Sequence, residues 1–202
     1  MAYRNFTFAE LESKFGVIQT KSNLFDLSEI PAITPSDYLL ETMRLSKSLP
    51  LTTEKIISEA LVFPILREIK SRNFESIELY SGENLDADKE SGLNGECDFI
   101  LAKAAGSVQL KAPLLQVIEA KQGEISKPKP LSQVSAQLIG IRVFNQKANK
   151  NIDTIYGVCT SGFEWLFLKL ENNEIIIDTQ PYFISDLPQL IGILQYIVNK
   201  NI

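Results

Sequence analysis

The sequence predicts a single α/β domain, and three observations support that class. The chain has 202 residues, which is enough for one substantial hydrophobic core. Its apolar fraction of 45% and charged fraction of 22% are typical of folded globular proteins. Segments with helical spacing alternate along the chain with short apolar runs of strand length. We therefore expect a central mixed β-sheet flanked by helices.

Residues 1–50 are expected to form an N-terminal helical extension packed on a core made by residues 51–202. Apolar residues recur every three or four positions in the segment 7–15, which predicts a short amphipathic helix. A threonine followed by proline opens a second predicted helix over 34–47. An irregular connection is expected between these helices, over 24–34.

The core segment begins with a longer helix predicted over 53–71. Pro64 should kink this helix, because proline lacks a backbone donor and clashes with the preceding turn. Glu59 lies among the apolar positions of the same helix, which is unusual for a carboxylate. Strands are predicted at 75–80, 96–102, 114–120, 154–159, 164–170 and 175–178, and two further helices at 131–146 and 186–199, the last capped by Asp186.

The chain contains no histidine, and this absence excludes several classes of chemistry. Nucleophilic triads with a His base, His-ligated zinc and haem on a proximal His are all removed. Cys97 and Cys159 each lie in an apolar run, which favours two small buried residues over a disulfide. Any catalysis must use carboxylates, lysine, and an oxygen-liganded metal such as Mg²⁺ or Mn²⁺.

The net charge of −5 is unevenly distributed. Residues 1–100 carry 10 Lys+Arg and 17 Asp+Glu, whereas residues 101–202 carry 10 and 8. A locally basic stretch matters more to a phosphate backbone than the total charge does, but charge alone slightly favours an ordinary solvated helix and loop. The basic residues from 121 to 150 are Lys121, Lys127, Lys129, Arg142, Lys147 and Lys150.

The apolar runs and the N-terminus predict a protein of the cytoplasm. The longest apolar runs, such as 187–198, are interrupted and too short to span a bilayer. The first eight residues lack the basic start and apolar stretch of a secretory signal. We therefore expect no membrane partner.

Charged residues lie at or near the ends of two neighbouring predicted strands and form the most informative cluster of the sequence. Asp98 lies in the strand 96–102, and Glu119 and Lys121 lie at the end of the strand 114–120. Because side chains alternate along a strand, Glu119 and Lys121 should point the same way. Such a cluster is costly to bury without ions or partners. An exposed same-face pair, with Asp98 capping a loop, is the alternative interpretation.

These residues, in this order, resemble the PD-(D/E)xK nuclease superfamily, which includes many restriction endonucleases and recombination nucleases. The family pattern is a helix with a glutamate, a strand with a metal-binding aspartate, a strand with Glu-x-Lys, and often a helix with a glutamine. The residue before Asp98 is Cys97, where the family name has proline, but that proline is often absent. The matching positions here are Glu59, Asp98, Glu119, Lys121 and Gln137.

A later stretch is similar to the nuclease domain at the N-terminus of type I restriction motor subunits. There a G-x-x-T-x-G-x-x-W hairpin follows the glutamine helix, and this chain has Gly157, Thr160, Gly162 and Trp165 at that spacing. We interpret Trp165 as a packing residue rather than a base-stacking platform. The resemblance covers about residues 53 to 170 and implies a restriction-endonuclease-like core.

The resemblance implies a role for each residue of the site. Asp98, Glu119 and the backbone carbonyl of Ala120 would hold Mg²⁺ or Mn²⁺, and Glu59 would contact the ion through water. Lys121 would orient or help deprotonate the attacking water. Gln137 would position Lys121 or a phosphate, and Gln133, one helical turn earlier, competes for that role. For Glu59 the alternative is a helix-surface residue near Lys55.

The implied activity is metal-dependent DNA endonuclease cleavage in restriction, repair or mobile-element processing, with DNA as the partner. A homodimer, or a larger restriction or recombination assembly, is compatible with such an activity. The alternative function is a catalytically silent nuclease-fold module that binds nucleic acid or a protein. A third reading, an unrelated α/β enzyme acting on a small metabolite, lacks a phosphate-cradling glycine loop to support it.

Overall fold

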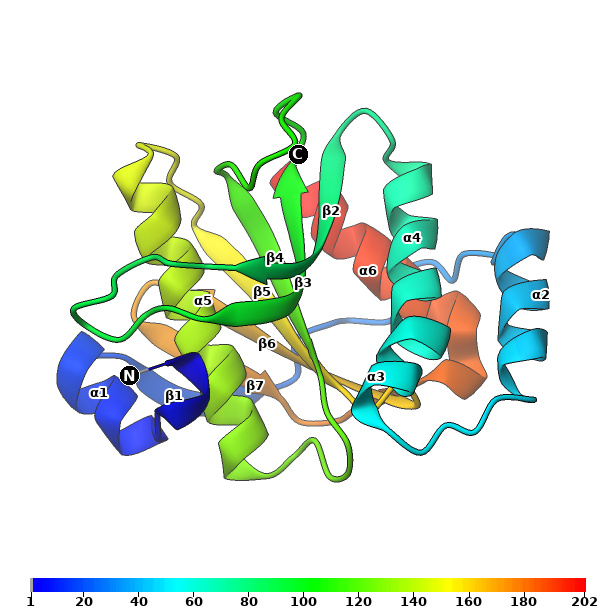
Figure 1. The fold of residues 1–202 in the computed structure, drawn as a ribbon, viewed down its shortest axis with the longest axis horizontal. Coiled ribbons are helices and arrows are strands. Elements are labelled where there is room, and N and C mark those ends of the chain that lie inside the picture. The colour runs from blue at the N-terminus through cyan, green and yellow to red at the C-terminus, as the bar shows by residue number, and fades with distance from the viewer. Residues whose placement is uncertain (1) are drawn as a thin grey trace.

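A mixed β-sheet runs through the middle of the computed structural model, which describes residues 2–202 (Figure 1). Within those residues the sheet has eight strands: β1 (Ile18–Ser22), β2 (Ile77–Asn84), β3 (Glu96–Lys103), β4 (Leu114–Ala120), β5 (Thr154–Thr160), β6 (Glu164–Glu171), β7 (Glu174–Asp178) and β8 (Tyr182–Phe183). The order is β1-β7-β6-β5-β4-β3-β2, with β8 paired to β6. Two pairs, β1 with β7 and β4 with β5, are parallel, and the other pairs are antiparallel.

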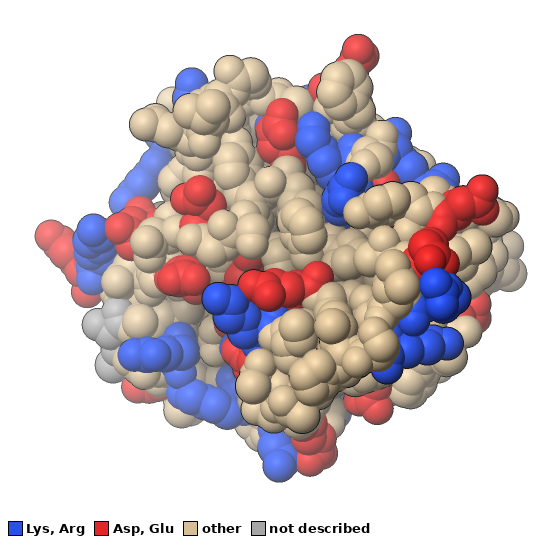
Figure 2. Space-filling model, turned by 45° about the vertical axis from the view of Figure 1, so that its right-hand side comes forward, with Lys and Arg blue, Asp and Glu red and all other residues tan. Residues whose placement is uncertain are grey.

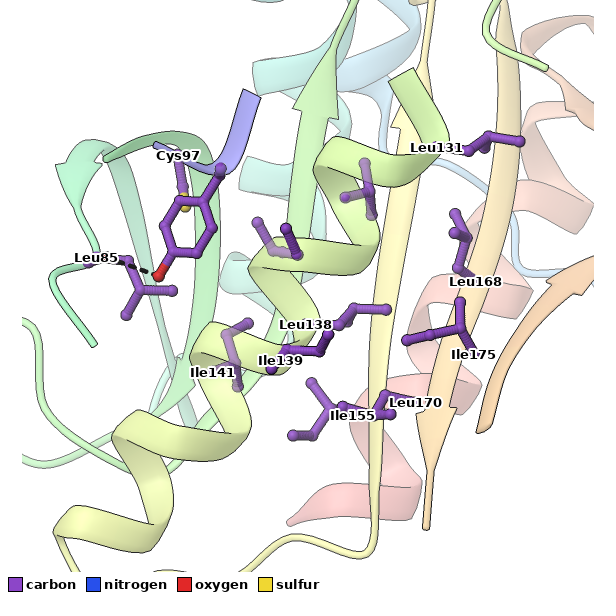
Figure 3. Close-up of a cluster of buried hydrophobic side chains, with 14 of the residues drawn as sticks. Leu85, Cys97, Leu131, Leu138, Ile139, Ile141, Ile155, Leu168, Leu170 and Ile175 are labelled. Carbon is purple, nitrogen blue, oxygen red and sulfur yellow. Dashed lines mark hydrogen bonds between the residues drawn. The ribbon is translucent and has the colours of Figure 1, made fainter. Parts of the chain in front are cut away.

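Helices cover both faces of this sheet, so the expected α/β class with a central mixed sheet is confirmed. One core lies between the sheet, the long helix and the N-terminal segment (Figure 3). The second core lies on the opposite face, under α4 and α6. The helices are α1 (Phe8–Phe15), α2 (Asp37–Ser46), α3 (Glu54–Ile57), α4 (Phe63–Arg72), α5 (Pro128–Lys147) and α6 (Leu187–Asn201).

The expected helix over 53–71 is interrupted near the predicted kink at Pro64. Its first turn is α3, followed by a π-helical turn over Ser58–Val62 and then α4. Pro64 has no N–H to donate to the carbonyl of Ala60, four residues earlier. The buried hydroxyl of Ser46, on α2, donates to that carbonyl instead, at 2.8 Å. The carbonyl that loses its helical donor at Pro64 is therefore satisfied by a side chain of the neighbouring helix.

The N-terminal segment differs from the purely helical extension that the sequence predicted. Helix α1 forms as expected, with a capping box between Thr7 and Glu10. The following residues, however, form β1, an edge strand that pairs with β7. This strand was missed because four of its five residues are exposed and it lacks an apolar alternation. Residues 1–50 therefore contribute a strand to the main sheet as well as two helices.

One predicted helix start and one predicted helix cap also need correction. The second helix begins after Ser36, whose hydroxyl accepts from the Leu39 N–H, rather than after Thr34. Asp186 occupies the N-cap position of α6, but its side chain makes no capping hydrogen bond there. Its backbone ψ of 59° is far from the extended conformation of typical N-cap residues. The other predicted helices and strands lie within a few residues of their predicted ranges, whereas the two-residue strand β8 was not predicted.

The G-x-x-T-x-G-x-x-W positions build the turn between β5 and β6. The Thr160 hydroxyl donates to the Glu164 carbonyl and accepts from the Gly162 N–H, at 2.7 and 2.9 Å. Trp165 is fully buried, and its indole N–H donates to the Gly162 carbonyl. Gly162 has φ of +81°, and a Cβ there would lie 2.6 Å from a methyl of Ile57. The motif therefore fixes this hairpin and packs it against α3, as expected for Trp165.

Gln116, in the middle of β4, is the basis of a stability prediction. Its side chain is completely buried, and both its amide nitrogen and its amide oxygen lack a hydrogen-bond partner. A buried unsatisfied polar group costs roughly 1–3 kcal/mol. We expect Gln116→Met, of similar shape, to raise the free energy of unfolding by about 1 kcal/mol in urea denaturation. Gln19→Met, at an exposed position of β1, is the matched control, and a destabilised Gln116→Met protein would contradict the prediction.

Candidate active site

The ends of β3 and β4 bring Asp98 and Glu119 together. Phe99 pairs with Ile118 across these antiparallel strands, so Asp98 lies opposite Glu119 on the same face. The backbone N–H of Ala120 donates to Asp98 Oδ2 at 2.7 Å. Lys121 follows directly, and its own N–H donates to the Thr160 carbonyl of β5 at 2.7 Å. Three adjacent strands therefore hold the backbone that carries the predicted cluster.

Glu119 is the centre of a hydrogen-bond network. Only 3% of the residue is exposed, and the Lys121 ammonium lies 2.7 Å from its Oε1 atom. The expectation that Glu119 and Lys121 share a face is thus confirmed. Two glutamines of α5 also donate to this carboxylate: Gln133 to Oε1, and Gln137 to Oε2 at 2.7 Å. These donors hold the carboxylate plane in one orientation.

The charges of the cluster shift one another's protonation. Burial, and then the negative charge of Glu119, raise the pKa of Asp98 to about 7, although the hydrogen bond from Ala120 opposes the rise. Burial lowers the pKa of Lys121, but the attraction and hydrogen bond of Glu119 more than offset it, so the pKa lies above its usual value. Lys121 is therefore a firmly held cation, whereas Asp98 shares its site with a second carboxylate.

The helix carboxylate beside this cluster is Glu54 rather than the predicted Glu59. The Glu59 side chain is 62% exposed and lies 4.0 Å from Lys55, which matches the alternative interpretation of a helix-surface residue. Glu54 lies 4.0 Å from the Lys121 ammonium and accepts from the backbone N–H of Gln122 at 3.1 Å. The sequence could not distinguish these residues, because the π-helical turn between α3 and α4 alters which helical positions face the sheet.

Gln137 and Gln133 divide the role that was predicted for one glutamine. Gln137 is fully buried and contacts Glu119, so it cannot touch a phosphate and does not contact Lys121 directly. Gln133 is only partly buried and lines the hollow in front of the cluster. Gln137 is thus an orienting residue for Glu119, and Gln133 is the glutamine that a substrate could reach.

An N-terminal residue that the sequence reasoning missed completes this hollow. Arg4 lies with Asp98, Glu119, Lys121 and Gln133 around a cavity of ≈ 400 Å³. Its backbone is fixed by its neighbour Tyr3, which is buried and donates to the Leu85 carbonyl at 2.8 Å (Figure 3). The aromatic residues flanking Arg4 in the sequence were the available signal, because buried rings hold an exposed residue between them in place.

The basic stretch between residues 121 and 150 does not act as one surface. Lys121 pairs with Glu119, Lys127 with Glu124, and Lys147 donates to the Ala87 carbonyl. Arg142 donates to the carbonyl of Asn172. On the face shown in Figure 2, acidic and basic side chains are likewise interspersed. The cationic side chains that line the hollow of the cluster itself are Arg4 and Lys121.

Compared with known protein families and with curated proteins, the sequence matches no family model and no individual protein. Among residues 2–202, no three His, Cys, Asp or Glu side chains form a group that could hold a metal ion. The ligands that the resemblance implies are two carboxylates and one backbone carbonyl, so they do not make up a group of three such side chains. In the same part of the chain, none of the helices combines the length and apolarity needed to cross a membrane. The fold and site define an α/β protein with a buried carboxylate–lysine cluster at one end of its sheet.

Proposed function

We propose that this protein is a metal-dependent nuclease that hydrolyses DNA phosphodiesters in restriction, repair or mobile-element processing. The observation that carries the proposal is the meeting of Asp98, Glu119 and Lys121 in one partly open hollow. A carboxylate pair beside a fixed cation suits a reaction in which negative charge develops on a phosphate. A cluster kept only for stability gains little from this arrangement, because buried ion pairs rarely repay their desolvation.

The order of the elements supports the same proposal. An antiparallel series β2-β3-β4 leads into α5, and α5 leads into β5, which runs parallel to β4. This arrangement places the Glu-x-Lys residues on the strand next to the aspartate strand, with the glutamine helix packed on β4 and β5. It agrees with the restriction-endonuclease-like core that the resemblance implies.

Asp98, Glu119 and the carbonyl of Ala120 would hold Mg²⁺ or Mn²⁺. The donor set fits such an ion, because all three ligands are hard oxygens and two are carboxylates that repel each other. The bound ion would polarise the scissile phosphate and lower the pKa of a water molecule. The glutamines on α5 orient Glu119, which keeps its oxygens fixed when the site is loaded.

Lys121 and Arg4 supply the positive charge on the protein side. Because its pKa is raised, Lys121 stays protonated at neutral pH and acts as a hydrogen-bond donor rather than as a base. It would orient the attacking water and stabilise the charge that develops on the phosphate oxygens. Arg4, which lines the same hollow, would contact a neighbouring phosphate.

One observation favours the second candidate function, a silent nuclease-fold module that binds nucleic acid or a protein. Both carboxylate oxygens of Glu119 are already hydrogen-bonded within the chain. These three donors occupy most of the lone-pair positions of the carboxylate, so a metal ion at this residue competes with them for space. If these hydrogen bonds keep a metal ion from binding to Glu119, the protein would bind nucleic acid or a protein partner without cutting DNA.

A cleavage assay with supercoiled, linear, single-stranded and branched DNA distinguishes the two functions. We expect cutting in Mg²⁺ or Mn²⁺ and none in EDTA. Thermal melting with and without Mn²⁺ is the second measurement, because a ligand that binds only the folded state raises the melting temperature. Wild-type protein that cuts no DNA, and whose melting temperature Mn²⁺ does not change, would overturn the nuclease proposal in favour of the binding module.

A further inference from the structure

A second hollow adjoins Asp98. It has a cavity volume of ≈ 720 Å³ and lies between α3, the π-helical turn and the strands β2 and β3. Asp98 and Glu96 border both hollows, so the two cavities meet at the proposed reaction centre. A DNA strand whose phosphate lies at Asp98 therefore has this second hollow directly beside it.

An exposed aromatic ring forms part of the wall of this second hollow. Phe63 is 38% exposed, although it begins α4 and follows the buried end of the π-helical turn. Its ring stacks on the buried ring of Phe99, with centroids 6.2 Å apart and an interplanar angle of 27°. One face of Phe63 is thus held by the core while the residue remains accessible. Trp165, the aromatic considered from the sequence, is fully buried and cannot serve this purpose.

The charges around Phe63 select the kind of group that can enter. Four carboxylates line the hollow. Among the described residues that line it, the one lysine is Lys55, which lies 4.0 Å from the carboxylate of Glu59. Apart from Asp98, where the proposed metal ion would hold a phosphate, the carboxylates of this wall repel the phosphates of a nucleic acid. The wall accepts hydrogen bonds from an uncharged group with N–H donors, which is what the edge of a nucleobase offers. The carboxylates are Glu54, Glu59, Glu96 and Asp98.

We propose that this hollow binds an unpaired nucleobase, stacked on Phe63, next to the phosphate held at Asp98. A base inside a duplex is paired and stacked on its neighbours, so it cannot enter without being extruded. The protein is therefore selective for single-stranded DNA or for single-stranded flaps on a duplex. This inference rests on the proposed nuclease function and specifies its substrate class.

The test compares cleavage of a single strand, the same strand in a full duplex, and a duplex with a single-stranded flap. Stacking on an aromatic side chain is worth about 1–3 kcal/mol per base. We therefore expect Phe63→Ala to slow cutting of the single strand and the flap by about 5- to 150-fold, with little change on the duplex. Phe63→Trp should keep the wild-type preference, because it restores a ring face.

Two further variants control for effects on folding. Phe63→Leu keeps apolar volume against Phe99 but has no ring, so it should lose the preference as Phe63→Ala does even if the alanine variant folds poorly. Phe74→Ala removes an exposed ring just beyond the other end of α4 and should behave as the wild type. An unchanged ratio of single-strand to duplex cutting in both Phe63→Ala and Phe63→Leu would overturn the inference.

Binding distinguishes a failure of this inference from a failure of the nuclease proposal. If the wild type cuts none of the three substrates, cleavage is lost as a function, but the base site can still be measured. Fluorescence anisotropy with labelled oligothymidylate in Ca²⁺ then supports the inference if Phe63→Leu weakens binding and Phe74→Ala does not. Equal binding by the wild type and both variants contradicts it.

Discussion

Asp98→Asn and Lys121→Ala are each expected to lower Mn²⁺-dependent DNA cleavage by about 10²- to 10⁴-fold while the protein stays folded. Asp98→Asn removes a negative charge from the proposed metal site, where Glu119 is the carboxylate directly opposite. Lys121→Ala removes the cation 2.7 Å from Glu119, whose two glutamine partners remain. Initial cleavage rates, with circular dichroism and thermal melting of each variant, provide the measurement.

The controls for this first prediction are exposed residues of the loop between β2 and β3. Glu90→Gln removes an exposed carboxylate, and Lys89→Ala removes an exposed lysine that pairs with Asp86. Both controls should cut DNA at the wild-type rate. Cleavage that persists at full rate in both site variants would show that the assigned cluster does not carry the reaction.

The pH dependence of stability gives Asp98→Asn a second signature. Because the pKa of Asp98 is raised in the folded state, the folded protein binds more protons than the unfolded chain between pH 4 and about 7. Stability therefore falls as pH rises through that window, and the loss is complete above it. Asparagine cannot ionise, so the variant should gain melting temperature relative to the wild type as the pH is raised from 5 to 8. A constant difference across this range would contradict the assignment.

Gly162→Ala is expected to destabilise the protein by roughly 2–5 kcal/mol, a large part of the roughly 5–15 kcal/mol typical of a domain. A φ of +81° costs a residue with a Cβ roughly 1–2 kcal/mol. The new Cβ would also lie 2.6 Å from Ile57 and 3.1 Å from a methyl of Leu61, and overpacking costs about 1–3 kcal/mol. Urea denaturation of the wild type and the variant measures the sum.

Gly106→Ala separates the two contributions at Gly162. Gly106 has a similarly positive φ of +59°, but a Cβ there would meet nothing within 4 Å. Gly106→Ala should therefore show the backbone cost alone, and the difference between the two variants measures the contact with α3. If both variants lose the same stability, the packing of the β5–β6 turn against α3 is not what requires glycine at 162.

The local patterns of the sequence were sufficient for most of the fold. Apolar runs of strand length predicted β3, β4 and β5, and helical spacing predicted α5, because these elements have faces that must be buried. The edge strand β1 escaped prediction because its side chains are largely exposed and its pairing partner, β7, lies more than 150 residues later in the chain. Its formation depends on a sheet edge, which no local pattern reports.

For the candidate site too, the sequence predicted some of the residues, and the others depended on tertiary packing. Strand alternation within 114–121 was enough to place Glu119 and Lys121 together, because their separation of two residues fixes their common direction. Which distant residues join them depended on packing. Glu54 replaces Glu59 beside Lys121 because a π-helical turn interrupts the helix, and Arg4 reaches the hollow because Tyr3 is buried beneath it.

By itself, the amino-acid sequence determined the α/β class, the carboxylate–lysine pair at the end of β4, and the exclusion of histidine chemistry. These follow from residue type and short-range periodicity, which act over a few positions of the chain. Only the tertiary structure decided that both oxygens of Glu119 are hydrogen-bonded and that Phe63 is the aromatic beside Asp98. Those outcomes depend on contacts between elements distant in sequence, whose geometry is set by how the helices pack on the sheet.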